Sequence, residues 1–150
     1  NGDDSAFYKP ETINDVVAVH SETNSVLTFV SLDKDDPKGL GRVVRNKEGK
    51  LIGIIEEKDA TVEQRKIKEV NDGLYVIEKD WFERNIGKVN LSPQGEYYLV
   101  DLIKMAVGNK EKVSVYKLKD NSEWQGVNTP EELEEARRKM VERLKLCNQL

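Results

Sequence analysis

The sequence has a single cysteine, Cys147, and a single histidine, His20, among its 150 residues. One cysteine cannot form an intramolecular disulfide, which fits a reducing compartment, and we therefore expect a cytoplasmic protein. One histidine cannot build a zinc site, and a catalytic triad would need a second partner beside it. We expect His20 to be a structural or surface residue.

Long apolar runs and a surplus of basic residues are also missing. No apolar run approaches the ~20 residues that span a bilayer, so we expect no membrane association. The 24 basic and 28 acidic residues give a formal net charge of −4. That balance offers nothing to hold a polyanionic backbone, so we expect no nucleic-acid partner. The hydrophobic fraction of 37% is enough for the core of one domain of this size.

Strand and helix patterns alternate along the chain. Helical spacing or capping signals predict helices over residues 10–21, 61–69, 79–87, 96–107 and from 129 onward. Alternating or β-branched runs predict strands over residues 26–32, 42–45, 51–55, 73–77 and 113–118, with a polar loop over 33–40. Such alternation predicts an α/β fold with a mixed sheet.

The clearest local signal opens the last helix. Thr129 is placed to cap it, Pro130 fits its first turn, and Glu132 completes a capping box. An apolar stripe with helical spacing then predicts a buried face made of Leu133, Ala136, Met140 and Leu144.

The opening of the chain resembles the exit of a strand whose body is absent. Asn1, Gly2, Asp3 and Asp4 form a polar turn, and the first residue is not methionine. We therefore expect residues 1–150 to be part of a longer protein.

Four polar residues lie at predicted strand ends or in the loops beside them: Asp3, Glu56, Asn71 and Asn128. Ligands of open α/β sheets bind beyond the carboxyl ends of strands. An aspartate and an asparagine suit Mg²⁺, and a glutamate and an asparagine suit sugar hydroxyl and amide groups. Each residue also has a structural explanation, as a strand terminator, a solvated turn or an asparagine favoured beside glycine.

Five blocks of the sequence resemble a known protein family, which the four polar residues alone do not indicate. They are GLGRVVR (39–45), GIIEEKDAT (53–61), EVNDG (69–73), QGEYYLVD (94–101) and GVN (126–128). In order and spacing they strongly resemble the bacterial N-acetylglucosamine-1-phosphate uridyltransferase family. The resemblance implies a Rossmann-like nucleotide-diphospho-sugar transferase fold, of which this chain is the second, sugar- and metal-binding half. The half that holds the triphosphate in a glycine-rich loop is expected to precede Asn1.

The same resemblance implies a role for each site residue. Asp3 and Asn128 correspond to the pair that holds Mg²⁺ and serves catalysis. The positions expected to bind substrate are Asn1, Gly2, Gly41, Glu56, Asn71 and Tyr98. The implied reaction joins a sugar-1-phosphate, N-acetylglucosamine-1-phosphate in this family, to UTP and releases pyrophosphate.

The chain departs from the family pattern at Leu40, Asp72 and Val100, where tyrosine, threonine and threonine are common. One alternative is therefore a hexose-1-phosphate uridylyltransferase or thymidylyltransferase. Another alternative is a non-catalytic half-domain that binds sugar nucleotides or associates with other chains. The chain lacks a phosphate loop, so it is expected to be inactive by itself. Such a half would pair with the missing half or form a homo-oligomer.

Overall fold

The structure of the chain, a computed structural model, describes residues 6–92 and 95–147. Its α-helices are α1 (Pro10–Thr23), α2 (Val62–Arg65), α3 (Lys79–Asn85), α4 (Val100–Gly108) and α5 (Pro130–Cys147). Its strands are β1 (Leu27–Asp33), β2 (Arg42–Arg45), β3 (Leu51–Ile55), β4 (Glu69–Ile77) and β5 (Val113–Lys117). Short 3-10 turns lie at Glu57–Asp59, Ile86–Lys88 and Asn121–Glu123.

The strands form one mixed sheet in the order β3-β2-β4-β1-β5. β1 pairs with β4 antiparallel and with β5 parallel, and β2 and β3 form an antiparallel hairpin. β2 meets β4 at a single pair of residues, Arg42 and Val70. The predicted α/β class with a mixed sheet is confirmed.

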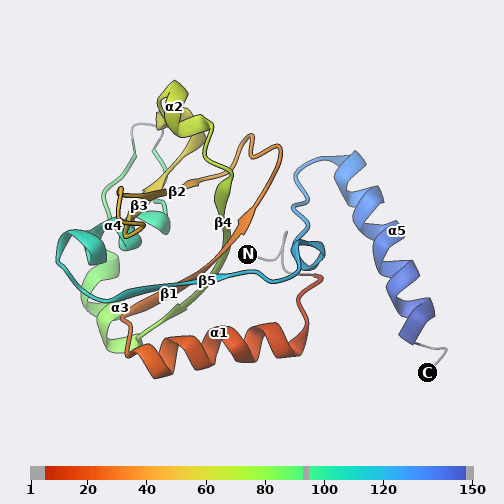
Figure 1. Cartoon of the computed structure of the whole chain (residues 1–150), viewed down its shortest axis with the longest axis horizontal. Helices are drawn as coiled ribbons and strands as arrows, with labels where there is room; N and C mark the ends of the chain where they lie inside the picture. Colours follow the sequence, from red (N-terminus) through yellow and green to blue (C-terminus); the bar gives the residue numbers. More distant parts are fainter. Residues whose placement is uncertain (1–5, 93–94, 148–150) are drawn as a thin grey trace.

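The two faces of β1 supply two cores because side chains alternate along a strand. Leu27 and Phe29 enter a cluster that includes Trp81 and residues of α4, whereas Val30 and Leu32 pack with Val16 of α1. Figure 1 shows α1 lying along one face of the sheet, with α3 and α4 on the other side. All four β1 side chains are at most 1% exposed, so β1 is the centre of the molecule.

The predicted capping signals are confirmed at both helices that carry them. Thr61 and Gln64 form a reciprocal capping box at the start of α2. At α5, Glu132 accepts from the backbone N–H of Thr129 at 3.0 Å, and its own N–H donates to the Thr129 hydroxyl at 3.2 Å. These contacts satisfy N–H groups that have no partner within the helix.

Three predicted boundaries were wrong. The second helix ends at Arg65, β4 begins at Glu69 instead of residue 73, and α4 begins at Val100 instead of residue 96. The start of β4 is polar, so the apolar pattern did not predict it as strand. Glu69 lies there because Arg45 forms a two-pronged ion pair with its carboxylate, at 2.7 and 2.8 Å. Such a pair lets a charged residue lie within a sheet.

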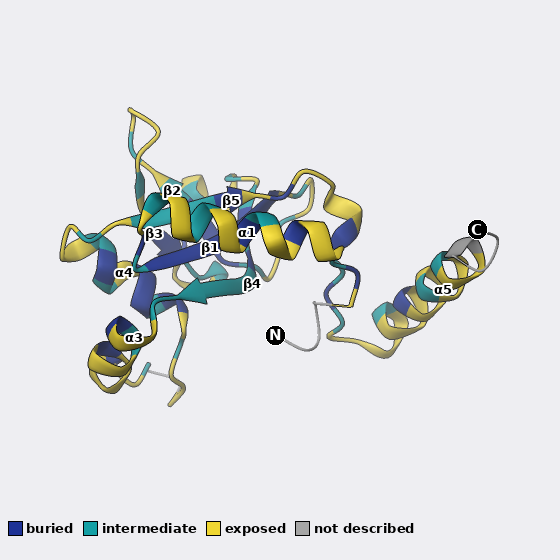
Figure 2. Cartoon of the chain, turned by 90° about the horizontal axis from the view of Figure 1, so that it is seen from below, coloured by how far each residue is buried: buried dark blue, intermediate teal, exposed yellow. Residues whose placement is uncertain are grey.

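The predicted buried stripe of α5 was also wrong. Ala136 is buried, but Leu133 and Leu144 are 59% and 54% exposed. Figures 1 and 2 show α5 extending away from the sheet, with most of its surface exposed. Within the described part of the chain, no helix is both long and apolar enough to cross a membrane.

Candidate functional site

Three of the predicted site residues meet beside the β2–β3 hairpin. The backbone N–H of Asn71, on β4, donates to the carbonyl of Gly41 at 2.9 Å. Glu56 follows the end of β3, and a methyl group built on Gly41 would lie 3.2 Å from its Oε1. Gly41 is buried and lacks a side chain, which lets the Glu56 carboxylate lie against the backbone.

Asn71 presents an acceptor that no residue in 6–92 or 95–147 satisfies. Its Nδ2 donates to the Tyr75 hydroxyl at 2.6 Å. Its Oδ1 is buried and receives no hydrogen bond from the described part of the chain. A buried carbonyl oxygen without a donor costs about 1–3 kcal/mol, so the group is placed to accept from a ligand.

The Glu56 carboxylate is half-buried and receives no hydrogen bond from any residue in 6–92 or 95–147. Burial raises its pKa above the usual range, against the opposing attraction of Lys104 and Lys58. Glu56 and Asn71 therefore supply two acceptors that need donors, which is the chemistry of a ligand rich in hydroxyl and amide N–H groups.

Tyr98 joins the site through a lysine that the sequence did not single out. Lys58 donates to the Tyr98 hydroxyl, and its ammonium nitrogen lies 4.4 Å from the centre of the Tyr98 ring. The hydroxyl in turn donates to Glu96 at 2.6 Å. Lys58 lies two residues after Glu56, so this contact ties the segment before α4 to the end of β3.

Arg42 is a second residue whose role the sequence did not predict. The residue is 1% exposed, and its guanidinium donates to the Leu40 carbonyl and pairs with Glu57 at 2.5 Å. Arg42 thereby links the backbone before and after Gly41 to Glu57, the residue that follows Glu56. The signal was available, because an arginine directly after Gly-Leu-Gly in an apolar run needs a buried partner.

Trp124, four residues before Asn128 in the sequence, contacts the neighbour of Asn71. The Trp124 indole N–H donates to the backbone carbonyl of Asp72, the neighbour of Asn71, at 3.2 Å. A methyl group built on Gly126 would lie 3.2 Å from the Trp124 ring and 3.5 Å from Asn128 Nδ2. Asn128 is exposed, and its side chain makes no hydrogen bond with the described residues.

Tyr8, five residues after Asp3 in the sequence, contacts the neighbour of Asn71. The Tyr8 hydroxyl donates to the carboxylate of Asp72, which is 2% exposed and also accepts from the backbone N–H of Leu74 at 2.8 Å. Asp72 is one of the departures from the family pattern, and the hydrogen bond from Tyr8 stabilises its buried carboxylate. Asn1, Gly2 and Asp3 lie outside the described residues.

Within residues 6–92 and 95–147, no group of three or more Asp, Glu, His or Cys side chains could hold a metal ion. Asn128, by contrast, has an uncommitted carboxamide oxygen, the hard donor that Mg²⁺ accepts. The described part of the predicted metal pair therefore fits that ion.

Comparison with known proteins decides the family. The family model described as nucleotidyl transferase matches residues 2–143. The chain belongs to the nucleotidyl transferase family. The bifunctional protein GlmU of Alkaliphilus oremlandii is 42% identical over 131 residues, which cover 87% of this chain and 29% of that protein. GlmU of Streptococcus mutans is 34% identical over 142 residues, covering 94% of this chain and 31% of that protein.

This nucleotidyl transferase chain thus spans less than a third of the length of these relatives. The matching part is the N-terminal part of these relatives, not their C-terminal half. That the chain is the second half of its nucleotidyltransferase domain stays a prediction. A structure of a Bacillus anthracis protein assigned as a glucose-1-phosphate thymidylyltransferase, in complex with sucrose, has a TM-score of 0.68. It is 20% identical and covers 90% of this chain and 50% of that one, which supports the predicted nucleotide-sugar transferase fold.

Proposed function

We propose that the chain is the sugar- and metal-binding half of a Mg²⁺-dependent nucleotidyltransferase domain that joins N-acetylglucosamine-1-phosphate to UTP. The observation that carries the proposal is the meeting of Gly41, Glu56 and Asn71, with two acceptors that receive no hydrogen bond from the residues that the structure describes. The hydroxyl groups and the amide N–H of an N-acetylated hexose would supply those donors. The identity to proteins named GlmU supports the same assignment.

In the proposed reaction, a phosphate oxygen of the sugar phosphate bonds to the α-phosphorus of UTP. The bond from that phosphorus to the oxygen bridging to the β-phosphorus breaks, and pyrophosphate leaves with that oxygen. Such a transfer asks the protein for positioning and charge neutralisation, not for a covalent nucleophile. Glu56 and Asn71 would position the hexose beside the buried backbone of Gly41.

Asp3 and Asn128 would hold the Mg²⁺ ion, which when bound neutralises phosphate charge. Tyr8 and Trp124 support this proposal, because they lie five residues after Asp3 and four residues before Asn128 in the sequence and both contact Asp72. The metal role of the pair stays a prediction. Loss of Mg²⁺-dependent affinity in Asn128→Ala, measured by calorimetry with UDP-N-acetylglucosamine, would support it.

The experiment that tests the function has two arms. In the first, residues 1–150 are titrated with UDP-N-acetylglucosamine in the presence of Mg²⁺, and binding is expected. In the second, the chain is joined to the preceding half of a nucleotidyltransferase domain and assayed for pyrophosphate release from UTP and N-acetylglucosamine-1-phosphate. Release with glucose-1-phosphate instead would favour the hexose-1-phosphate alternative. No binding and no release with any sugar phosphate and triphosphate would refute the enzyme proposal.

One observation favours a second candidate, in which the chain is an assembly half-domain. The apolar side chains of Leu133, Val141 and Leu144 on α5 are 59%, 45% and 54% exposed. Covering this stripe with the same stripe of a second copy would remove it from water. Sedimentation is expected to show a dimer that Leu144→Glu weakens, and a compact monomer at high concentration would count against this candidate.

A further inference from the structure

The outer edge of β5 is a second place where the molecule presents unmet binding groups. β5 is the last strand in the sheet order, and its inner edge pairs in parallel with β1 from Val113 to Lys117. Val26 N–H donates to Lys112 C=O, and Leu118 N–H donates to Ser31 C=O. Even-numbered residues of β5 therefore turn their peptide groups toward β1. Since alternate peptide groups point to opposite edges, Val113, Val115 and Lys117 turn theirs outward.

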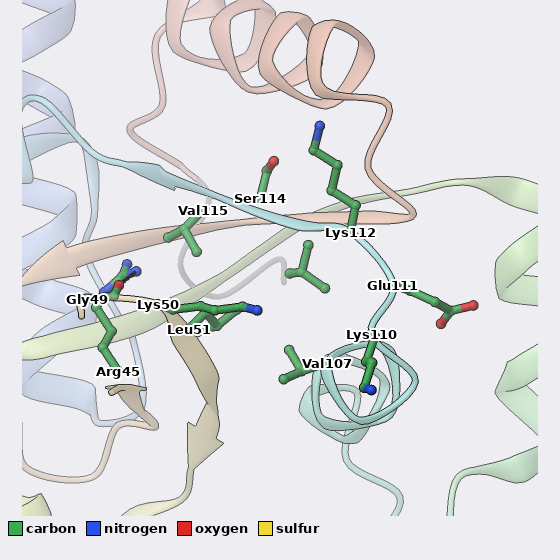
Figure 3. A pocket seen from close by; sticks show the side chains of 11 residues that line it. Arg45, Gly49, Lys50, Leu51, Val107, Lys110, Glu111, Lys112, Ser114 and Val115 are labelled. Atoms are coloured by element: carbon green, nitrogen blue, oxygen red, sulfur yellow. Dashed lines mark hydrogen bonds between the residues drawn. The ribbon is translucent and has the colours of Figure 1, made fainter. Parts of the chain in front are cut away.

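A groove of about 750 Å³ lies along this edge, between β5, the β2–β3 hairpin and the end of α4 (Figure 3). We call it the β5 groove. Its lining residues are Arg45, Gly49, Lys50, Leu51, Val107, Lys110, Glu111, Lys112, Val113, Ser114 and Val115. It contains none of the residues assigned above to the sugar or the metal.

The floor of the β5 groove is apolar. Leu51, Val107, Val113 and Val115 are half-buried and pack against the core that contains Trp81. Figure 3 shows the labelled members Leu51, Val107 and Val115 coming from the hairpin, α4 and β5, on the side of β5 away from Ser114. Apolar side chains of a ligand could therefore be buried between three elements.

The rim of the groove is positively charged. Lys50, Lys110 and Lys112 line it, and none of their ammonium groups has a carboxylate within ion-pair distance in residues 6–92 and 95–147. Of the other charged lining residues, Arg45 is paired with Glu69 at 2.7 Å, and Glu111 accepts from the Trp81 indole N–H at 2.8 Å. Three cations without a carboxylate partner thus flank a strand edge to which no described strand pairs.

We propose that the β5 groove binds an extended, acidic and apolar peptide segment of a partner protein, by addition of a strand to β5. Backbone hydrogen bonds to Val113, Val115 and Lys117 would hold the segment, and its alternate side chains would enter the apolar floor. The lysines select the occupant, because they repel a second copy of this edge and attract carboxylates.

The geometry sets the size of the segment. At ~3.4 Å per residue, the five residues of β5 give an edge about 17 Å long, room for about five residues of a bound strand. Lys110 and Lys112 lie at the amino end of β5, so acidic residues belong at the end of the segment that lies there. This places a partner-binding surface outside the candidate sugar site.

The test uses residues 1–150 and a blocked, fluorescent peptide of about seven residues, with alternating valine and threonine and two glutamates at one end. The reversed peptide covers the opposite strand direction. Binding is measured by anisotropy and mapped by amide chemical shifts. We expect shifts at residues 113–117 and an affinity that falls about tenfold in Lys50→Glu/Lys110→Glu/Lys112→Glu. A charge-matched control, Lys66→Glu/Lys79→Glu/Lys88→Glu, should bind as the unchanged chain does.

A peptide N-methylated on the amides that would pair with β5 separates strand addition from simple charge attraction. We expect it to lose about tenfold in affinity for the unchanged chain. Equal binding of the methylated peptide, equal binding to the groove variant, shifts elsewhere in the chain, or no binding would each overturn the proposal. If the groove variant melts early, the methylated peptide still decides the question on the unchanged chain.

Discussion

A methyl group on Gly41 is the smallest change that should damage the candidate sugar site. In Gly41→Ala the new Cβ would lie 2.9 Å from Ile54 Cγ2 and 3.2 Å from Glu56 Oε1. Favourable carbon contacts lie at about 3.5–4.0 Å, so the overlap with Ile54 is about 0.6 Å. Ile54 is 2% exposed and belongs to the core, so it cannot move into solvent. Gly41 has no left-handed φ, so the effect is purely steric.

Overpacking of this kind costs about 1–3 kcal/mol in the free energy of unfolding, and the Glu56 carboxylate should move as well. Urea denaturation followed by fluorescence gives the first effect, and calorimetric titration with UDP-N-acetylglucosamine gives the second. Gly87→Ala is the matched control, because a Cβ there meets nothing within 4 Å. If Gly41→Ala and Gly87→Ala unfold at the same urea concentration and bind equally well, the proposed close packing of Gly41 against Glu56 is wrong.

Three further changes follow from the same structure. Asn71→Ala removes a buried oxygen that has no partner among the described residues, together with the 2.6 Å hydrogen bond to Tyr75. The free energy of unfolding should therefore change by less than about 1 kcal/mol, while the calorimetric affinity for UDP-N-acetylglucosamine falls about tenfold. Glu56 has a raised pKa, so its contribution to stability is present at low pH and is lost as pH rises through the folded-state pKa. Glu56→Gln should therefore melt no lower than the unchanged chain at neutral pH, yet bind more weakly; a lower melting temperature would contradict this. Leu144→Glu should change the free energy of unfolding of the dilute chain by less than about 0.5 kcal/mol, because the Leu144 side chain is 54% exposed. A larger loss of that free energy in urea denaturation would show that this face of α5 is packed.

The sequence predicted those elements whose apolar residues follow a simple period. α1, β1 and the β2–β3 hairpin lie within two residues of their predicted bounds, because their burial depends on local alternation or helical spacing. The start of β4 could not be predicted in this way. Its polar residues are held by distant partners: Ser31 donates to Glu69 across 38 positions, and Tyr8 donates to Asp72 across 64.

The candidate site depended on the resemblance more than on periodicity. Nothing local distinguishes Glu56 from Glu57. The Glu56 carboxylate nevertheless receives no hydrogen bond from the described residues, whereas the Glu57 carboxylate pairs with Arg42. The contact of Lys58 with Tyr98 joins residues 40 positions apart, so only the folded chain reveals it. For α5 the spacing indicated an apolar face correctly but could not indicate whether this chain covers it.

The exposure of α5 determines which spectroscopic probe reports on which part of the molecule. Ala136 is the one buried side chain among residues 130–145, and the helix touches the remainder through Arg143, which donates to Phe7 C=O at 2.6 Å, and through Lys139. Both tryptophans, Trp81 and Trp124, lie outside it. Backbone amides of α5 should therefore exchange with deuterium well before those of β1, and far-ultraviolet ellipticity should fall while indole emission is still native. If the chain is the assembly half-domain of the second candidate, a second copy would cover the helix, and that early exchange should slow as protein concentration rises.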